Sequence, residues 1–118
     1  MHIESFRDYC LAKKAVTEGM PLGETVLVFK VAGKMFALAS MNSDPFQVNL
    51  KCDPEKAVEL RDEYDEILPG YHMNKQHCNT VIIGNGNLTD RLVKELIDHS
   101  YDLIVASLSK KQRTELEG

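Results

Sequence analysis

The chain has 118 residues, 43% of them hydrophobic and 27% charged, so it can bury a core without needing disulfides or metal ions. It has no apolar run near the roughly 18 residues of a membrane-spanning helix and no signal-peptide pattern at its N-terminus. The net charge of −4 weighs against indiscriminate nucleic-acid binding, which needs a basic surface. We expect one cytoplasmic domain over residues 1–118, monomeric and without a cofactor.

The N-terminal third predicts a helix followed by a β-hairpin. Apolar residues at helical spacing predict a helix over residues 2–14. The β-branched and aromatic runs at 26–31 and 34–39 predict two strands. Gly33 lies between them and can adopt the positive φ that a short turn requires.

A third strand is expected over residues 46–52, because apolar and polar side chains alternate strictly along it. Such alternation is typical of an antiparallel sheet with one buried and one solvated face. The expected solvated side chains are Gln47, Asn49 and Lys51. The three strands together predict an antiparallel meander.

The next segment predicts a helix and then a second hairpin. Asp53-Pro54 is a favourable helix start, since aspartate caps free N–H groups and proline suits the first helical position. We expect this helix to end at residues 68–70 and a hairpin to follow over residues 71–83. Its clear strand is 80–83, whereas 71–73 is a weak one.

The C-terminal part predicts two helices. The longer runs over about residues 90–106, with Thr89 as its N-cap. Ser109 and Gln112 fit a capping box that opens a short last helix. The element order αβββαββαα predicts an α+β fold, in which helices pack on one face of an antiparallel sheet of about five strands.

Five motifs, four of them with five or more residues, together resemble the MmcQ/YjbR-like family over almost the whole chain. They are Phe29–Ala37, Leu50–Pro54, Pro69–Lys75, His77–Val81 and Ser100–Leu103. The resemblance implies a frataxin-like (CyaY-like) α+β fold and a double-wing arrangement of β-hairpins that binds DNA. The resemblance implies tryptophan at the position of Cys78. If that tryptophan belongs to a contact surface, the function at this corner is altered here; if it only packs, Cys78 is a smaller substitute.

We interpret the polar sheet face and the second hairpin as a candidate nucleic-acid interface. Lysine neutralises phosphate as a point charge, and asparagine or glutamine can read base edges. The competing interpretation is an ordinary solvated sheet face. The candidate residues are Lys30, Lys34, Gln47, Asn49, Lys51, Tyr71, His72, Asn74, Lys75 and His77.

The segment 71–79 is the most function-like stretch because it is dense in hydrogen-bond donors and contains an aromatic ring. It can serve as a wing, or as part of a small-ligand or protein-interaction module. It can equally be a structural hairpin whose polar side chains bond to the local backbone. A concave site beside Tyr71 and His77 would favour the interaction module over a flat basic face.

Metal binding and catalysis find little support in the sequence. Cys10, Cys52 and Cys78 are widely spaced and odd in number, which fits reduced thiols. His77 and Cys78 are neighbours and would point to opposite faces of a strand. The run Asp98-His99-Ser100 cannot form a hydrolase triad, because adjacent helical residues point in different directions. We expect a non-enzymatic protein.

Overall fold

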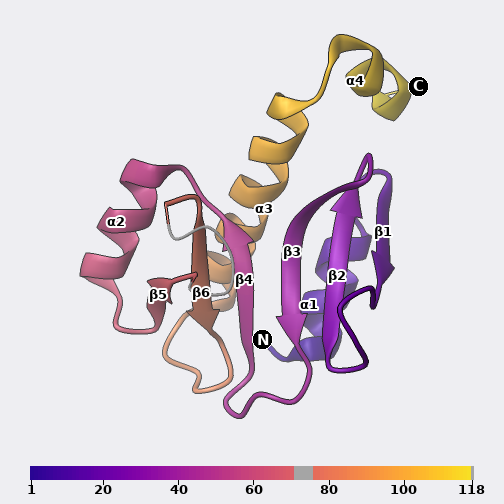
Figure 1. Cartoon of the computed structure of the whole chain (residues 1–118). Helices are drawn as coiled ribbons and strands as arrows, with labels where there is room; N and C mark the ends of the chain where they lie inside the picture. The colour runs from indigo at the N-terminus through magenta and orange to yellow at the C-terminus, as the bar shows by residue number, and fades with distance from the viewer. Residues whose placement is uncertain (71–75, 118) are drawn as a thin grey trace.

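The computed structural model describes residues 1–70 and 76–117. Its central feature is a six-stranded antiparallel sheet with the order β1-β2-β3-β4-β6-β5 (Figure 1). The strands are β1 (Val16–Gly19), β2 (Val26–Val31), β3 (Lys34–Ser40), β4 (Gln47–Lys51), β5 (Ile67–Pro69) and β6 (Cys78–Ile82). The helices are α1 (Ile3–Leu11), α2 (Pro54–Glu63), α3 (Asp90–Ser107) and α4 (Lys110–Glu117). The predicted α+β class is confirmed.

Two edge strands account for the difference from the predicted sheet. β1 lies in a segment for which the sequence predicted no element, and it forms a strand by pairing with β2 over four positions. β5 occupies residues that we expected to end the preceding helix, and it pairs with β6 from Ile67↔Val81 to Pro69↔Asn79. The predicted weak strand at 71–73 lies outside the described residues. Both short strands depend on a neighbouring strand, which local sequence patterns do not reveal.

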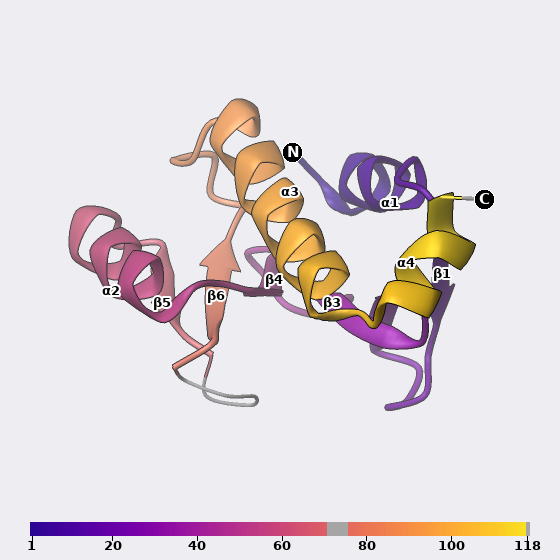
Figure 2. The same ribbon diagram turned by 90° about the horizontal axis from the view of Figure 1, so that it is seen from above.

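The helices α1, α2 and α3 lie on the same face of the sheet, as the view from above shows (Figure 2). The alternation in β4 points Val48 and Leu50 into this helix-covered face, where both are buried. Phe6 of α1 packs edge-on against Phe29 and Phe46, with ring centroids 5.8 and 5.9 Å apart. Burial of these apolar side chains is the main force holding the helices on the sheet.

The helix starts follow the predicted capping pattern. The Asp53 side chain accepts a hydrogen bond from the Lys56 amide at 3.2 Å, and Thr89 accepts one from the Leu92 amide at 3.1 Å. Ser109 and Gln112 form the reciprocal capping box of α4, with two bonds of 3.1 Å. These contacts satisfy amides that would otherwise lack an acceptor in the first helical turn.

The β2–β3 connection is a tight two-residue turn. Gly33 has a φ of 76°, and Ala32 has a φ of 51°. Two successive positive φ values are typical of the primed turns that match the twist of a β-hairpin. The turn therefore projects the Lys34 end of β3 as a short, well-defined hairpin tip.

Cys78, at the position where the family resemblance implies tryptophan, is fully buried. Gly70 lies directly against it, and its amide donates to the Cys78 carbonyl at 3.1 Å. In this chain the position contributes to packing and not to an exposed contact surface. No helix in the described ranges is long and apolar enough to cross a membrane.

Candidate nucleic-acid interface

Antiparallel pairing gathers three segments at one end of the sheet. The β2–β3 turn lies there because Val31 pairs with Lys34, and the end of β4 lies there because Lys51 pairs with Cys78 at the start of β6. His77 immediately precedes β6 at the same end. We call this region, with the β2–β3 turn, Lys51 and His77, the hairpin end (Figure 1).

The predicted site residues are only partly brought together. Lys34 and His77 are exposed at the hairpin end, and Lys51 is half-buried there. Lys30 is half-buried one position below the β2–β3 turn, opposite Met35. Gln47 starts β4 and pairs with Ile82, so it lies at the other end of the sheet. Four further candidates lie outside the described residues: Tyr71, His72, Asn74 and Lys75.

The prediction that Asn49 faces solvent is wrong. Its side chain is on the helix-free face as expected, but only 5% of the residue is exposed. Its Oδ1 accepts a hydrogen bond of 2.6 Å from the Thr80 hydroxyl on the adjacent strand β6. β4 is a central strand, and neighbours on both sides cover a short side chain in the middle of it. Asn49 is therefore a structural residue and is not available to read a base.

Ser100 of α3 fixes the position of the helix against the hairpin end. Pairing between β3 and β4 stops at Ala37↔Leu50. Beyond it, the buried Ser100 hydroxyl accepts a bond of 2.9 Å from the Lys51 amide and donates to the Phe36 carbonyl. The serine thus replaces a missing strand-to-strand contact and ties α3 to both strands.

A cleft lies one helical turn further along α3. Leu103 and Ile104 face the end of β4 and the start of α2, and the cleft has a volume of about 200 Å³. We call it the Lys51–Leu103 cleft. Its lining residues are Lys51, Cys52, Asp53, Pro54, His77, Leu103 and Ile104. Of the predicted candidates within the described residues, Lys51 and His77 meet here.

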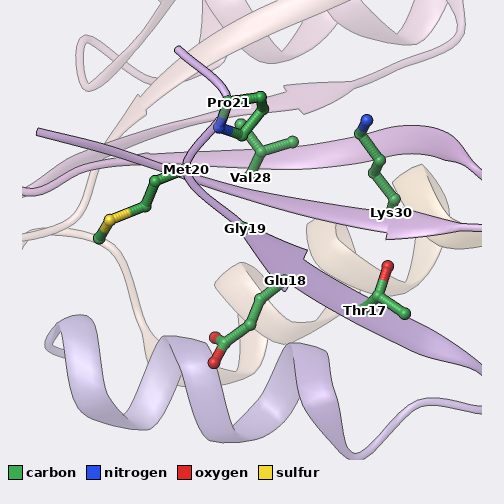
Figure 3. Close-up of a pocket in the computed structure, with 7 residues that line it drawn as sticks. All are labelled: Thr17, Glu18, Gly19, Met20, Pro21, Val28 and Lys30. Carbon is green, nitrogen blue, oxygen red and sulfur yellow. The ribbon is translucent and has the colours of Figure 1, made fainter. Parts of the chain in front are cut away.

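Lys30 belongs to a separate groove of about 350 Å³ along β1 and β2. Figure 3 shows Lys30 and Thr17 on one side of the strands, whereas Glu18 points to the other side, towards α1. The Glu18 carboxylate is bound there by Arg7 at 2.7 Å from Nε. This contact lowers the pKa of Glu18 through the hydrogen bond from Arg7. The negative charge of Glu18 is therefore directed away from Lys30.

Helix α4 packs beside the β2–β3 turn at the hairpin end. Gln112, Glu115 and Leu116 line a cavity together with Ala32 and Gly33 of the β2–β3 turn. The exposed cations of this helix are Lys110, Lys111 and Arg113. The sequence did not indicate where they lie, because α4 is positioned by tertiary contacts, including a 2.9 Å bond from Lys14 Nζ to the Glu117 carbonyl.

Most acidic side chains of the 53–66 segment lie elsewhere. Helix α2 carries four exposed carboxylates, Glu55, Glu59, Asp62 and Glu63. This helix lies beside β5 and β6, on the opposite side of the molecule from the β2–β3 turn (Figure 1). The overall charge of −4 is therefore unevenly distributed, and the β2–β3 side of the hairpin end keeps its lysines without this acidic neighbour.

The described residues contain no group of three histidine, cysteine or carboxylate side chains placed to hold a metal ion. All three cysteines are buried and unpaired. Burial raises the pKa of the Cys10 thiol to about 12 and also raises that of Cys52. A protonated, buried thiol is a poor nucleophile. Neither Cys10 nor Cys52 is activated for covalent chemistry.

His99 links α3 to the start of α2 beside the cleft. Its Nε2 accepts a 3.2 Å hydrogen bond from the Asp53 amide. Burial lowers the pKa of His99, and the positive charge of Lys56 lowers it further, whereas Asp53 and Asp102 oppose the shift. The neutral imidazole is therefore favoured in the folded protein, and protonation at Nε2 would remove the acceptor of the Asp53 amide.

This lowered pKa predicts a loss of stability on mild acidification. The unfolded chain binds the proton near the ordinary histidine value of 6.5, before the folded chain does. The free energy of unfolding should thus fall as the pH drops below that value and level off below the folded-state pKa. Denaturant titrations on either side of this window measure it. His99→Gln, which keeps an acceptor, should show a smaller pH dependence; an unchanged dependence would contradict this assignment.

A family model described as YjbR matches residues 11–103. The Escherichia coli O157:H7 protein YbdF is 40% identical over 94 residues, covering 79% of this chain and 75% of its own. YjbR of Escherichia coli K12 is 31% identical over 113 residues, which cover 96% of this chain and 95% of YjbR.

Solved structures agree with the sequence comparison. A Deinococcus radiodurans protein superposes with a TM-score of 0.89 at 35% identity, covering 98% of this chain and 87% of that one. A Pseudomonas syringae protein superposes with a TM-score of 0.75 at 31% identity, covering 87% and 98% of the respective chains. The family match covers most of the chain, and the fold agrees along nearly all of it. The protein therefore belongs to the YjbR family.

Proposed function

We propose that this protein is a non-enzymatic nucleic-acid-binding domain that uses its hairpin end. The observation that carries the proposal is the strand register, which places Lys34, Lys51 and His77 at one end of the sheet. Helix α4 packs beside the β2–β3 turn through Gln112, Glu115 and Leu116, and its three exposed cations outnumber its two exposed glutamates. Lysines on rigid strand ends are suited to phosphate contacts, which supply most of the affinity in such complexes.

The expected binding is weak and sensitive to salt. Each phosphate neutralised on a duplex contributes about −0.9 to the slope of log affinity against log salt concentration. Contacts from Lys30, Lys34 and Lys51 would together give a slope of roughly −3. The net charge of −4 opposes association at long range, so low salt should be needed to detect the complex.

The test is an NMR titration of the labelled protein with a short mixed-sequence DNA duplex at two salt concentrations. Amides of residues 30–34 and 50–53 should shift together, and the shifts should fade at the higher salt. Lys34→Gln should reduce the salt slope by about one. The matched control is Arg91→Gln, because that side chain is 90% exposed in the first turn of α3 and carries the same charge. Absence of shifts at both salt concentrations, or an equal effect of the control, would refute the proposal.

A second candidate function is small-ligand binding in the Lys51–Leu103 cleft. The concave site beside His77 favours it over a flat basic face, and apolar and charged groups both line the cleft. A screen of metabolites by the same amide shifts tests it. Shifts confined to residues around 51–53 and 103–104, with no response to DNA, would support this function instead.

A further inference from the structure

We propose that the Lys51–Leu103 cleft holds one unstacked base of a single-stranded nucleic acid, whose adjoining phosphate contacts Lys51. This inference rests on the proposed nucleic-acid function and adds a preference for single strands. It comes from the cleft itself, which combines apolar walls with a cation and an imidazole at the hairpin end.

The size and lining of the cleft suit a single heteroaromatic ring. Its volume of about 200 Å³ is below the roughly 300 Å³ at which pockets for drug-sized ligands begin. Leu103 and Ile104 form an apolar wall on α3, and Pro54 forms another at the start of α2. An unstacked base packs its flat face against such apolar side chains, whereas Lys51 and the exposed His77 provide polar contacts.

The charges around the cleft set the orientation of the bound nucleic-acid strand. Asp53 lies at the cleft, and its Oδ2 is engaged by the Lys56 amide. A phosphate beside this carboxylate would be repelled, so the backbone of the strand must run on the Lys51 side. Lys34 lies in that direction, at the start of β3, which is the neighbour of β4 in the sheet. A nucleic-acid backbone that contacts Lys34 and Lys51 thus passes the mouth of the cleft.

Three hydrogen bonds hold the walls of the cleft in place before any ligand arrives. The Cys52 amide donates to the His77 carbonyl at 2.7 Å, and the Asp53 amide donates to His99 at 3.2 Å. Ser100 ties α3 to the Lys51 amide one turn before Leu103. A pre-formed site loses little conformational entropy when it binds, which favours recognition of a small group.

A base within a duplex is stacked and paired, and it must first be extruded before it can enter the cleft. Extrusion costs a few kcal/mol, and an unpaired strand avoids most of that cost. We therefore expect a short single strand to bind more tightly than a duplex of the same sequence, by about tenfold or more.

The experiment compares the affinities of a fluorescein-labelled single strand and its duplex, measured by anisotropy at low salt. Leu103→Trp fills the cleft without changing a charge and should abolish the preference for the single strand. Duplex binding should be unchanged. Leu22→Trp is the matched control, since Leu22 is 66% exposed in the β1–β2 connection, away from the cleft, and should leave the preference intact. His77→Ala, at an exposed position, should also reduce single-strand affinity if Leu103→Trp fails to fold.

The outcomes separate this inference from the function on which it rests. Equal affinity for the single strand and the duplex would overturn the proposed base-binding role of the cleft and leave duplex binding intact. A single-strand preference that survives both Leu103→Trp and His77→Ala would do the same. Failure to bind either nucleic acid overturns both proposals. A free mononucleotide that binds as tightly as the strand would show a small-ligand site and would also overturn the inference.

Discussion

Replacing Ser100 by alanine is expected to lower the free energy of unfolding by about 2–4 kcal/mol, because two backbone groups, one buried and one part-buried, lose their partner. The Lys51 amide would lose its acceptor, and the Phe36 carbonyl would lose its donor. Both groups lie where β3 and β4 no longer pair, so neither strand can replace the serine. Chemical denaturation followed by circular dichroism measures the change.

Ser107→Ala is the matched control for this substitution. Ser107 lies on the same helix, but it is exposed and its hydroxyl donates to the Ile104 carbonyl of its own helix at 2.6 Å. Its removal should change the free energy of unfolding by no more than about 0.5 kcal/mol. If the two alanine variants were equally stable, the bridging role of Ser100 would be wrong.

Gly84→Ala is expected to destabilise the opposite end of the sheet by about 1–3 kcal/mol or more, because there is no room for a methyl group. A Cβ at this position would meet the Phe46 amide nitrogen and would lie 3.1 Å from Pro45 Cβ. The segment cannot easily retreat, since the Ile83 and Gly84 amides both donate to the Phe46 carbonyl, at 2.8 and 2.9 Å. Thermal or denaturant unfolding reports the loss.

Gly19→Ala provides the comparison, because a Cβ there meets only Pro21 Cδ, at 3.9 Å. That distance is an ordinary van der Waals contact, so Gly19→Ala should be nearly neutral. Gly84 is remote from the hairpin end, so the folded fraction of Gly84→Ala should bind nucleic acid as the wild type does. Equal stability of the two alanine variants would show that the Phe46 segment adapts to the extra methyl group.

The sequence by itself determined most of the regular elements. β-branched and aromatic runs identified β2 and β3, and alternation identified the buried face of β4. Capping residues located the starts of α2 and α3. These features are encoded by contacts between residues close in the chain, which is why a local pattern predicts them. The family resemblance, which rested on motifs spread along the chain, was confirmed by the comparisons.

Tertiary structure decided which candidate side chains meet. Alternation placed Asn49 on the helix-free face correctly, but neighbouring strands bury it, and Thr80 occupies its oxygen. The meeting of Lys51 and His77 in one cleft follows from the β4–β6 register and from α3, whose Ser100 bond spans 49 residues of sequence. Strand order and helix docking arise from contacts between distant segments. Local patterns therefore identified the residue types of the site, and only the packed fold determined their arrangement.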